Sequence, residues 1–362
     1  MTTDAALATT AAGDEWVIDL AHVAKTYRGK IHALKGISMR VRRGEVFGLL
    51  GPNGAGKSTL VKILMTVIRP SRCDGTMLGH PVGSRPVLRR VGYLPEHHRF
   101  PPYLTGAQVL DFYAAMTEVN RADRRRRTPE LLELVGMRDW AKTKVSRYSK
   151  GMRQRVGIAQ ALMNDPDIVL LDEPTDGVDP VGRRDIRAIV QELRSRGKTV
   201  FLNSHLLSEL EMVCDRVAIL VGGQVASQGA IAELTAGQER YEIELALPPD
   251  GGTTLGGTAV PAVLEQIGTA LQPGPRAASA PDSSLAARRW HGTLATGESL
   301  EVDHATLRVG TTDPAAIQHI VDALRARGLV IRSIRPHRPS LEDLFMQAVE
   351  KPNGGPGKEG GA

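Results

Sequence analysis

The sequence predicts an α/β core with a helical insertion, followed by a small α+β domain. Residues 46–50 and 168–171 are continuous apolar runs, which is typical of strands buried on both faces of a mixed or parallel sheet. Stretches with helical periodicity alternate with these runs, and the composition changes after about Leu234. A chain of 362 residues, 41% of them hydrophobic, has room for one large domain and a smaller one.

The core begins with strands. Residues 15–20 alternate between apolar and polar positions, and residues 33–41 continue as a second strand-like stretch. The run at 46–50 ends in glycine, and a helix is expected to start at Lys57.

The middle section is predicted to be helical. One helix starts at Thr105 and places Val109, Leu110 and Tyr113 on one face; another starts at Pro129 and stops at Gly136. Strands return at 168–171, 200–203 and 216–221, with a helix that closes at Gly197 between the first two.

The C-terminal region reads as α+β. Strand composition is found at residues 241–247, 290–294, 300–303, 305–309 and 329–335. Asp313 caps one helix, and Ser340 with Asp343 opens a last helix by a variant of the capping box. We divide the chain into a core domain at 15–235, which includes a helical subdomain at about 97–160, and an accessory domain at 236–350. The accessory domain contains a Gly/Pro-rich insertion at 248–284. Flexible tails are expected at 1–14 and 351–362.

Composition limits the function classes. No run approaches the roughly 20 apolar residues that cross a bilayer, so we expect no membrane span and no secretory signal. Two distant cysteines argue against a disulfide framework and fit a reducing cytosol. The net charge of +6 is concentrated at Arg124 to Arg127, which reads as a solvated segment, a lipid-headgroup contact or a nucleic-acid contact. No aromatic residue interleaves with the run, so no nucleic-acid partner is expected.

A glycine-rich loop lies between the strand at 46–50 and the helix at Lys57. It satisfies the G-x-x-x-x-G-K-[ST] pattern of a P-loop NTPase, and its strand-loop-helix context favours nucleotide binding over an incidental turn. Glycines let backbone N–H groups converge on phosphate oxygens at the helix N-terminus. Lys57 is expected to neutralise the β and γ phosphates, and Ser58 to ligate Mg²⁺. The nucleotide-binding residues predicted here are Gly51, Pro52, Asn53, Gly54, Ala55, Gly56, Lys57, Ser58 and Thr59.

Two carboxylates follow the buried strand at 168–171. Asp172 and Glu173 emerge at its C-terminal end, where ligands of open α/β sheets bind. We expect Asp172 to hold Mg²⁺ through its water shell and Glu173 to polarise or deprotonate the attacking water.

In this order, the motifs resemble those of the ATPase subunits of ABC transporters. Between the loop and the acidic strand stands the segment Tyr148 to Arg155, which looks like the family's signature segment before a helix. The resemblance implies that Ser149 and the Gly151 amide bind the γ-phosphate held by a second subunit, so that nucleotide is sandwiched in a dimer.

Other family elements occur in sequence order. Tyr27 resembles the aromatic residue that stacks on adenine, and Asp179 resembles the aspartate of the dimer-contact loop. His205 resembles the histidine that contacts the γ-phosphate and orders Glu173 and water, which the resemblance makes a catalytic residue. The chain departs from the family at two positions: Glu96, expected near Mg²⁺, replaces a frequent glutamine, and Lys150 replaces a frequent glycine.

The resemblance covers roughly Glu15 to Leu234, and the segment Pro339 to Phe345 is similar to the end of export-type ATPases that include drug and antibiotic exporters. It implies ATP and Mg²⁺ as cofactors, and a homodimer or heterodimer joined to an integral membrane permease on a separate chain. The expected location is the cytoplasm, on the inner face of the cell membrane. The expected function is ATP hydrolysis coupled to export.

Two other readings stay open. One is an importer ATPase. The other is a soluble ABC ATPase acting on nucleic acid or ribosomes, which would show a long coiled-coil insertion, zinc-ligand cysteines or two ATPase halves. The accessory domain reads as a regulatory element, a dimer support or a stability extension.

Overall fold

The computed structural model describes residues 16–236, 240–246, 254–255, 258–259, 270–273, 290–294, 297–303, 306–326, 328–337 and 340–350. The chain divides into two compact units, Met1–Leu234 with Leu341–Ala362, and Thr235–Ser340. The tails expected at 1–14 and 351–362 lie outside the described residues. No described helix is long and apolar enough to cross a membrane.

A six-stranded sheet of order β10-β9-β3-β8-β7-β6 forms the centre of the first unit. Its strands are β3 (Val46–Leu50), β6 (Val91–Leu94), β7 (Ile168–Asp172), β8 (Thr199–Ser204), β9 (Arg216–Val221) and β10 (Gln224–Ala230). All pairs are parallel except β9 with β10. Every residue of β3, β7 and β8 is buried, which confirms the predicted α/β core.

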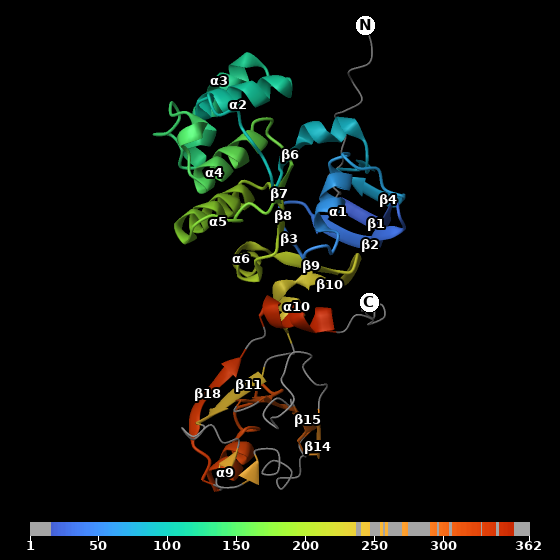
Figure 1. The fold of residues 1–362 in the computed structure, drawn as a ribbon, viewed down its shortest axis with the longest axis vertical. Helices are drawn as coiled ribbons and strands as arrows, with labels where there is room; N and C mark the ends of the chain where they lie inside the picture. The colour runs from blue at the N-terminus through green and yellow to red at the C-terminus, as the bar shows by residue number, and fades with distance from the viewer. Residues whose placement is uncertain are drawn as a thin grey trace. The chain divides into compact units, whose positions relative to one another are not determined.

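An antiparallel sheet of order β2-β1-β4-β5 lies on one side of the central sheet (Figure 1). It consists of β1 (Trp16–Tyr27), β2 (Ile31–Arg42), β4 (Arg72–Met77) and β5 (His80–Pro81). Helix α1 (Lys57–Leu64) shares one apolar cluster with these strands, where Phe47 stacks on Phe201 at 5.7 Å between ring centroids. The 3₁₀ helix η1 (Arg85–Arg90) leads into β6.

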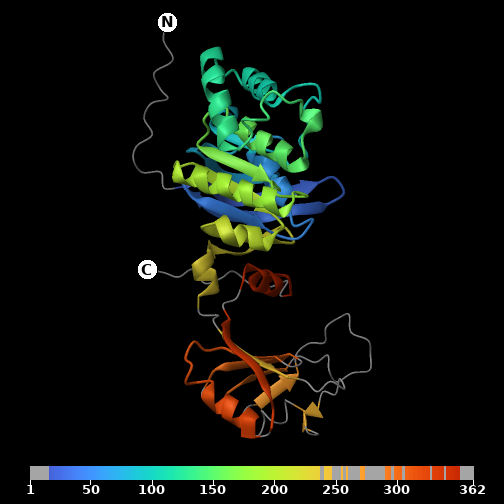
Figure 2. The same ribbon diagram turned by 90° about the vertical axis from the view of Figure 1, so that its left-hand side faces the viewer.

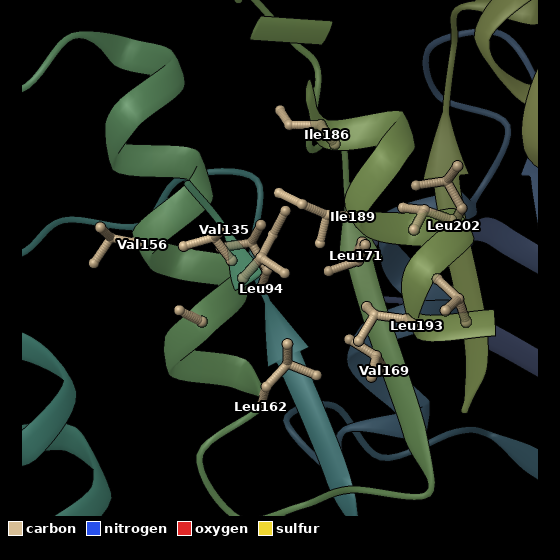
Figure 3. Packing of buried hydrophobic residues seen from close by; sticks show 14 of the residues in the cluster. Leu94, Val135, Val156, Leu162, Val169, Leu171, Ile186, Ile189, Leu193 and Leu202 are labelled. Atoms are coloured by element: carbon tan, nitrogen blue, oxygen red, sulfur yellow. The ribbon is translucent and has the colours of Figure 1, made fainter. Parts of the chain in front are cut away.

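Helices occupy the other side of the central sheet (Figure 1). They are α2 (Gly106–Met116), α3 (Arg121–Leu134), η2 (Val145–Arg147), α4 (Lys150–Ala161), α5 (Pro180–Ser195), α6 (Leu207–Val213) and α7 (Ile231–Thr235). Figure 3 shows Leu162, at the end of α4, on the side that faces Leu94, and Ile189 of α5 near Leu171. The signature helix α4 is therefore joined to the sheet by the same core as α5.

The helix predicted to start at Pro129 starts at Arg121, which corrects that prediction. The Asn120 side chain caps it by accepting a hydrogen bond from Asp123 N, so Pro129 lies inside the helix. The arginine run is therefore helical and used within the chain. Its ion pairs include Arg124 with Asp111 at 2.7 Å, Arg126 with Asp123 and Glu130, and Arg127 with Asp165.

The second unit is α+β, as predicted. Its antiparallel sheet has the order β14-β15-β16-β17-β11-β18, and α9 (Gln318–Ala326) covers one face (Figure 2). The strands are β11 (Arg240–Leu245), β14 (Ala270–Pro273), β15 (Trp290–Thr293), β16 (Ser299–Asp303), β17 (Thr306–Val309) and β18 (Ile331–His337). The loop predicted at 248–284 contains β14 and a short pair, β12 (Thr254–Leu255) with β13 (Thr258–Ala259), which the sequence did not predict. The other residues of that insertion lie outside the described residues.

Helix α10 (Leu341–Glu350) belongs to the first unit. Its place in the chain, after the accessory domain, predicted that it belongs to that domain. Its apolar face instead completes the core of the first unit, where Leu341 is fully buried and Leu344 and Phe345 pack against the same cluster. The Thr235–Ser340 unit is therefore inserted between two parts of the first unit.

Candidate functional site

The loop between β3 and α1 forms one wall of a cavity of about 440 Å³. Its shape requires glycine at two positions. A Cβ on Gly51 would lie 2.4 Å from the Leu220 carbonyl oxygen, and Gly56 has a left-handed φ of 107° with only 2.7 Å from its Cβ position to the Ala33 oxygen. The described lining residues are Ala33, Pro52, Asn53, Gly54, Ala55, Gly56, Lys57, Ser58, Thr59, Glu96, Glu173, Asp176 and His205.

Lys57 is a nearly buried cation at this cavity. Its ammonium donates to the carbonyl oxygen of Gly51 at 2.7 Å and reaches that of Pro52 at 3.4 Å. Burial lowers the pKa of Lys57, and the carboxylates of Glu173, Asp172 and Glu96 act in the opposite direction. A phosphate in the cavity would supply the strong anionic partner that this ammonium can bind.

Asp172 is a buried carboxylate at the end of β7. The Asn203 side-chain amide donates to Asp172 Oδ1 from the neighbouring strand β8. Burial raises the pKa of Asp172, and the nearby carboxylates of Glu96 and Glu173 raise it further. Three carboxylates thus gather near the cations Lys57 and Lys62, whose charges interact with them.

Glu173 and His205 face each other from the ends of β7 and β8. His205 Nδ1 lies 2.7 Å from Glu173 Oε2, and the His205 backbone N–H donates weakly to the same oxygen at 3.4 Å. Glu173 has a left-handed φ of 50°, and its backbone N–H donates to the Asn203 oxygen at 2.9 Å. A non-glycine residue in this conformation is strained and is held by its surroundings, which is common where side chains act in chemistry.

Thr59 extends the site toward Tyr27. The Tyr27 hydroxyl lies 3.4 Å from Thr59 Oγ1, and Lys25 Nζ lies over the Tyr27 ring at 5.1 Å from its centroid. Tyr27 is 37% exposed, so an aromatic side chain is accessible beside the phosphate loop.

Ser149, Gly151 and Asp179 are not among the described residues that line the cavity. Ser149 is exposed and caps α4 by accepting from Met152 N at 3.2 Å. Asp179 is exposed and caps α5 by accepting from Gly182 N at 2.8 Å. The structure therefore brings together the loop, Glu96, Asp172, Glu173 and His205, and places the signature residues elsewhere on the same unit.

Asp176 is a lining residue that sequence reasoning missed. It follows Glu173 by three positions, and its side chain pairs with Lys150 Nζ at 2.8 Å. Its spacing from Glu173 was the available signal, because a residue three positions on closes the same turn.

Comparisons with known proteins agree with this geometry. The sequence model of the ABC transporter family matches residues 34–176. An uncharacterized ABC transporter ATP-binding protein of Synechocystis is 38% identical over 92% of this chain and 85% of its own length. The daunorubicin resistance ATP-binding protein DrrA3 of Streptomyces coeruleorubidus is 32% identical, covering 88% of this chain and 91% of its own. A fluoroquinolones export ATP-binding protein of Mycobacterium tuberculosis is 39% identical over 61% of this chain and 72% of its own.

Solved structures share the fold. The protein cbiO1 of Clostridium perfringens, part of an ABC transporter complex, superposes with a TM-score of 0.57 at 29% identity, over 61% of this chain and 91% of its own. A dimeric ATP-binding cassette in a post-hydrolysis state with ADP and Pi has a TM-score of 0.54 at 27% identity, over 59% of this chain and 98% of its own.

Proposed function

The chain belongs to the ATP-binding, ATP-hydrolysing subunits of ABC transporters, and from this premise we propose that it drives export of a small molecule through a separate membrane permease. The observation that supports ATP hydrolysis is the cavity that the Lys57 loop and the Glu173–His205 pair line together. Export is supported by relatives named for daunorubicin resistance and fluoroquinolone export. The proposal places the chain in the cytoplasm, on the inner face of the membrane.

In the proposed reaction, Glu173 acts on the attacking water. His205 donates from Nδ1 to one oxygen of Glu173, which leaves the other oxygen to accept a proton from water. Lys57 and the backbone N–H groups of the loop hold the phosphates and neutralise their charge, which is most of what in-line phosphoryl transfer requires.

The residues at the strand ends fit Mg²⁺. Asp172 is buried beside Glu96 and Glu173, and this excess of carboxylate charge is the environment that a hard divalent cation relieves. Ser58, Asp172 and Glu96 are the residues we assign to it. When bound, Mg²⁺ neutralises charge on the transferred phosphoryl group.

A dimer is part of the proposal. Ser149 and Asp179 are exposed at the N-termini of α4 and α5 and lie outside their own chain's cavity, so they are available to the nucleotide of a second subunit, whereas Gly151 is buried in the first turn of α4. A similar solved cassette, with ADP and Pi, is dimeric, which supports a dimer for this chain. A homodimer is the simplest form, and a heterodimer would use the same surfaces.

We assign permease docking to a second cleft of about 790 Å³. Residues of η1 and β6 line one side, and the α2–α3 connection with the end of α4 lines the other. Charges of both signs, such as Arg89 and Glu118, accompany the exposed Met116. A permease segment seated there would contact both the sheet and the helical layer, and so would follow their relative motion.

Purification in detergent from native membranes tests the proposal. We expect the full chain to bring down an integral membrane protein and to hydrolyse ATP in that complex. Met116→Arg should abolish the association, whereas Met212→Arg, at a methionine similarly exposed on α6, should leave it intact. Recovery of the chain with nucleic acid or ribosomes and without a membrane protein would overturn the transport assignment.

A further inference from the structure

An ion pair joins the signature helix to the turn that carries Glu173. Lys150, the first residue of α4, places its ammonium 2.8 Å from Asp176 Oδ2. The two residues are 26 positions apart, and each side chain is 47% exposed. An exposed ion pair of this kind adds little to the free energy of unfolding, so we look for its effect on the turn that it holds.

Asp176 stands at the far end of a turn that begins at Glu173. The Asp176 backbone N–H donates to the Glu173 carbonyl oxygen at 3.2 Å, which closes the turn. Glu173 enters the turn with its left-handed φ of 50°, so the direction of its side chain depends on how the turn is held. Holding Asp176 therefore constrains the Glu173 carboxylate.

Packing joins the turn to the start of α4. The end of the Lys150 side chain lies against Gly177, which has a left-handed φ of 59°. Next along the chain, the buried Val178 packs on Gly151 of α4, with 3.1 Å between its Cγ1 and the Gly151 Cβ position. The hydrogen bond from Lys150 is the main cause that lowers the pKa of Asp176, so the carboxylate is the stable form beside the site.

We propose that Lys150 is a positioning residue for Glu173: by pairing with Asp176 it pins the end of the turn and keeps the Glu173 carboxylate aligned with His205. The inference rests on the proposed role of Glu173 as the group that acts on water.

Steady-state ATP hydrolysis by the full chain tests it with Lys150→Met, Asp176→Asn and the double variant. We expect kcat to fall about tenfold in each single variant, within the cost of a small misplacement of a catalytic group. KM for ATP should stay within about twofold, because neither residue is needed for binding. The double variant should be no worse than either single one, since both break the same contact. Lys150→Arg should retain most of the activity.

Arg138→Met is the matched control, because it removes an exposed ion pair with Glu133 away from the cavity and should leave kcat unchanged. Multiplying effects in the double variant would overturn the inference and indicate that Lys150 acts on phosphate directly. Unchanged kcat in Lys150→Met, with or without a lowered Tm, would also overturn it. If the unmodified chain bound ATP but did not hydrolyse it even with its permease, the proposed function itself would fail, and the inference with it.

Discussion

His205 Nδ1 donates to Glu173 Oε2 at 2.7 Å, from the end of the strand next to the one that carries Glu173. The carboxylate is almost buried, with 10% of its side chain exposed, whereas the imidazole is 45% exposed. One partner is thus fixed inside the unit and the other reaches toward the cavity. This difference fits a histidine that responds to the nucleotide and a glutamate that stays in place.

Replacing Glu173 with glutamine separates binding from chemistry. The amide keeps the size of the side chain but cannot accept a proton, so we expect turnover to fall by roughly 10²-fold or more while ATP binding persists. Without hydrolysis the ATP-bound dimer should accumulate, which light scattering after size-exclusion chromatography detects. Sustained hydrolysis by Glu173→Gln would contradict the assigned role.

Lys57→Ala should weaken ATP binding, which Glu173→Gln leaves intact. The ammonium sits at the floor of the phosphate loop with two carbonyl contacts, and its loss removes the cation that faces the phosphates. We expect nucleotide affinity to fall between about tenfold and hundredfold, the equivalent of about 1.5–3 kcal/mol for a hydrogen bond to a charged group. Equilibrium binding of a fluorescent ATP analogue measures it. An affinity equal to that of the unmodified chain would rule out the phosphate-loop interpretation.

Asp172→Asn should raise the thermal stability of the nucleotide-free chain and remove Mg²⁺-dependent hydrolysis. Its pKa is raised in the folded chain by burial and by Glu96 and Glu173, so the charged form at pH 7 destabilises the nucleotide-free protein. Asp172→Asn keeps an oxygen that can accept from Asn203 and removes that charge. We expect its Tm without Mg²⁺ to rise by about 2–4 °C, the shift that about 1 kcal/mol produces in a domain of this size, while Mg²⁺-dependent hydrolysis is lost.

The pH dependence of this difference has a defined sign. A carboxyl group with a raised folded pKa binds its proton more tightly in the folded state, so the folded chain gains stability as pH falls through that pKa toward the unfolded value of about 3.9. The Tm advantage of Asp172→Asn should therefore be full at pH 7 and shrink on acidification. Thermal scans of both proteins at a series of pH values check this, and an advantage that grows toward acid would refute the electrostatic explanation.

Sequence alone predicted the parts of the site that are local in the chain. The loop from Gly51 to Ser58 and the pair at the end of 168–171 carry their chemistry in consecutive residues, and buried strands are recognisable from their apolar runs. The Lys150–Asp176 contact was not predictable, because it joins two segments that only tertiary packing brings together.

The start of α3 shows a different difficulty. Its arginine-rich first half has no apolar face, so periodicity pointed to Pro129, whereas the Asn120 cap decides where the helix begins. For α10 the helical periodicity predicted the apolar face correctly, but it could not predict which unit that face packs against. That information lies in the core of the first unit, to which residues on either side of the insertion, such as Leu234 and Leu341, contribute.

Leu341→Ala tests whether α10 is part of the ATPase unit. Leu341 is fully buried in the cluster that includes Leu210 and Ile219, so its truncation should cost about 2–5 kcal/mol. Because ATP binds the first unit, the unfolding transition that ATP shifts to higher temperature identifies that unit. This transition should move down in Leu341→Ala. Met346→Ala on the same helix removes a side chain from a residue that is 48% exposed and should leave the transition nearly unchanged. If Leu341→Ala instead moved only a transition that does not respond to ATP, the helix would stabilise the inserted unit, and the assignment of α10 to the ATPase core would be wrong.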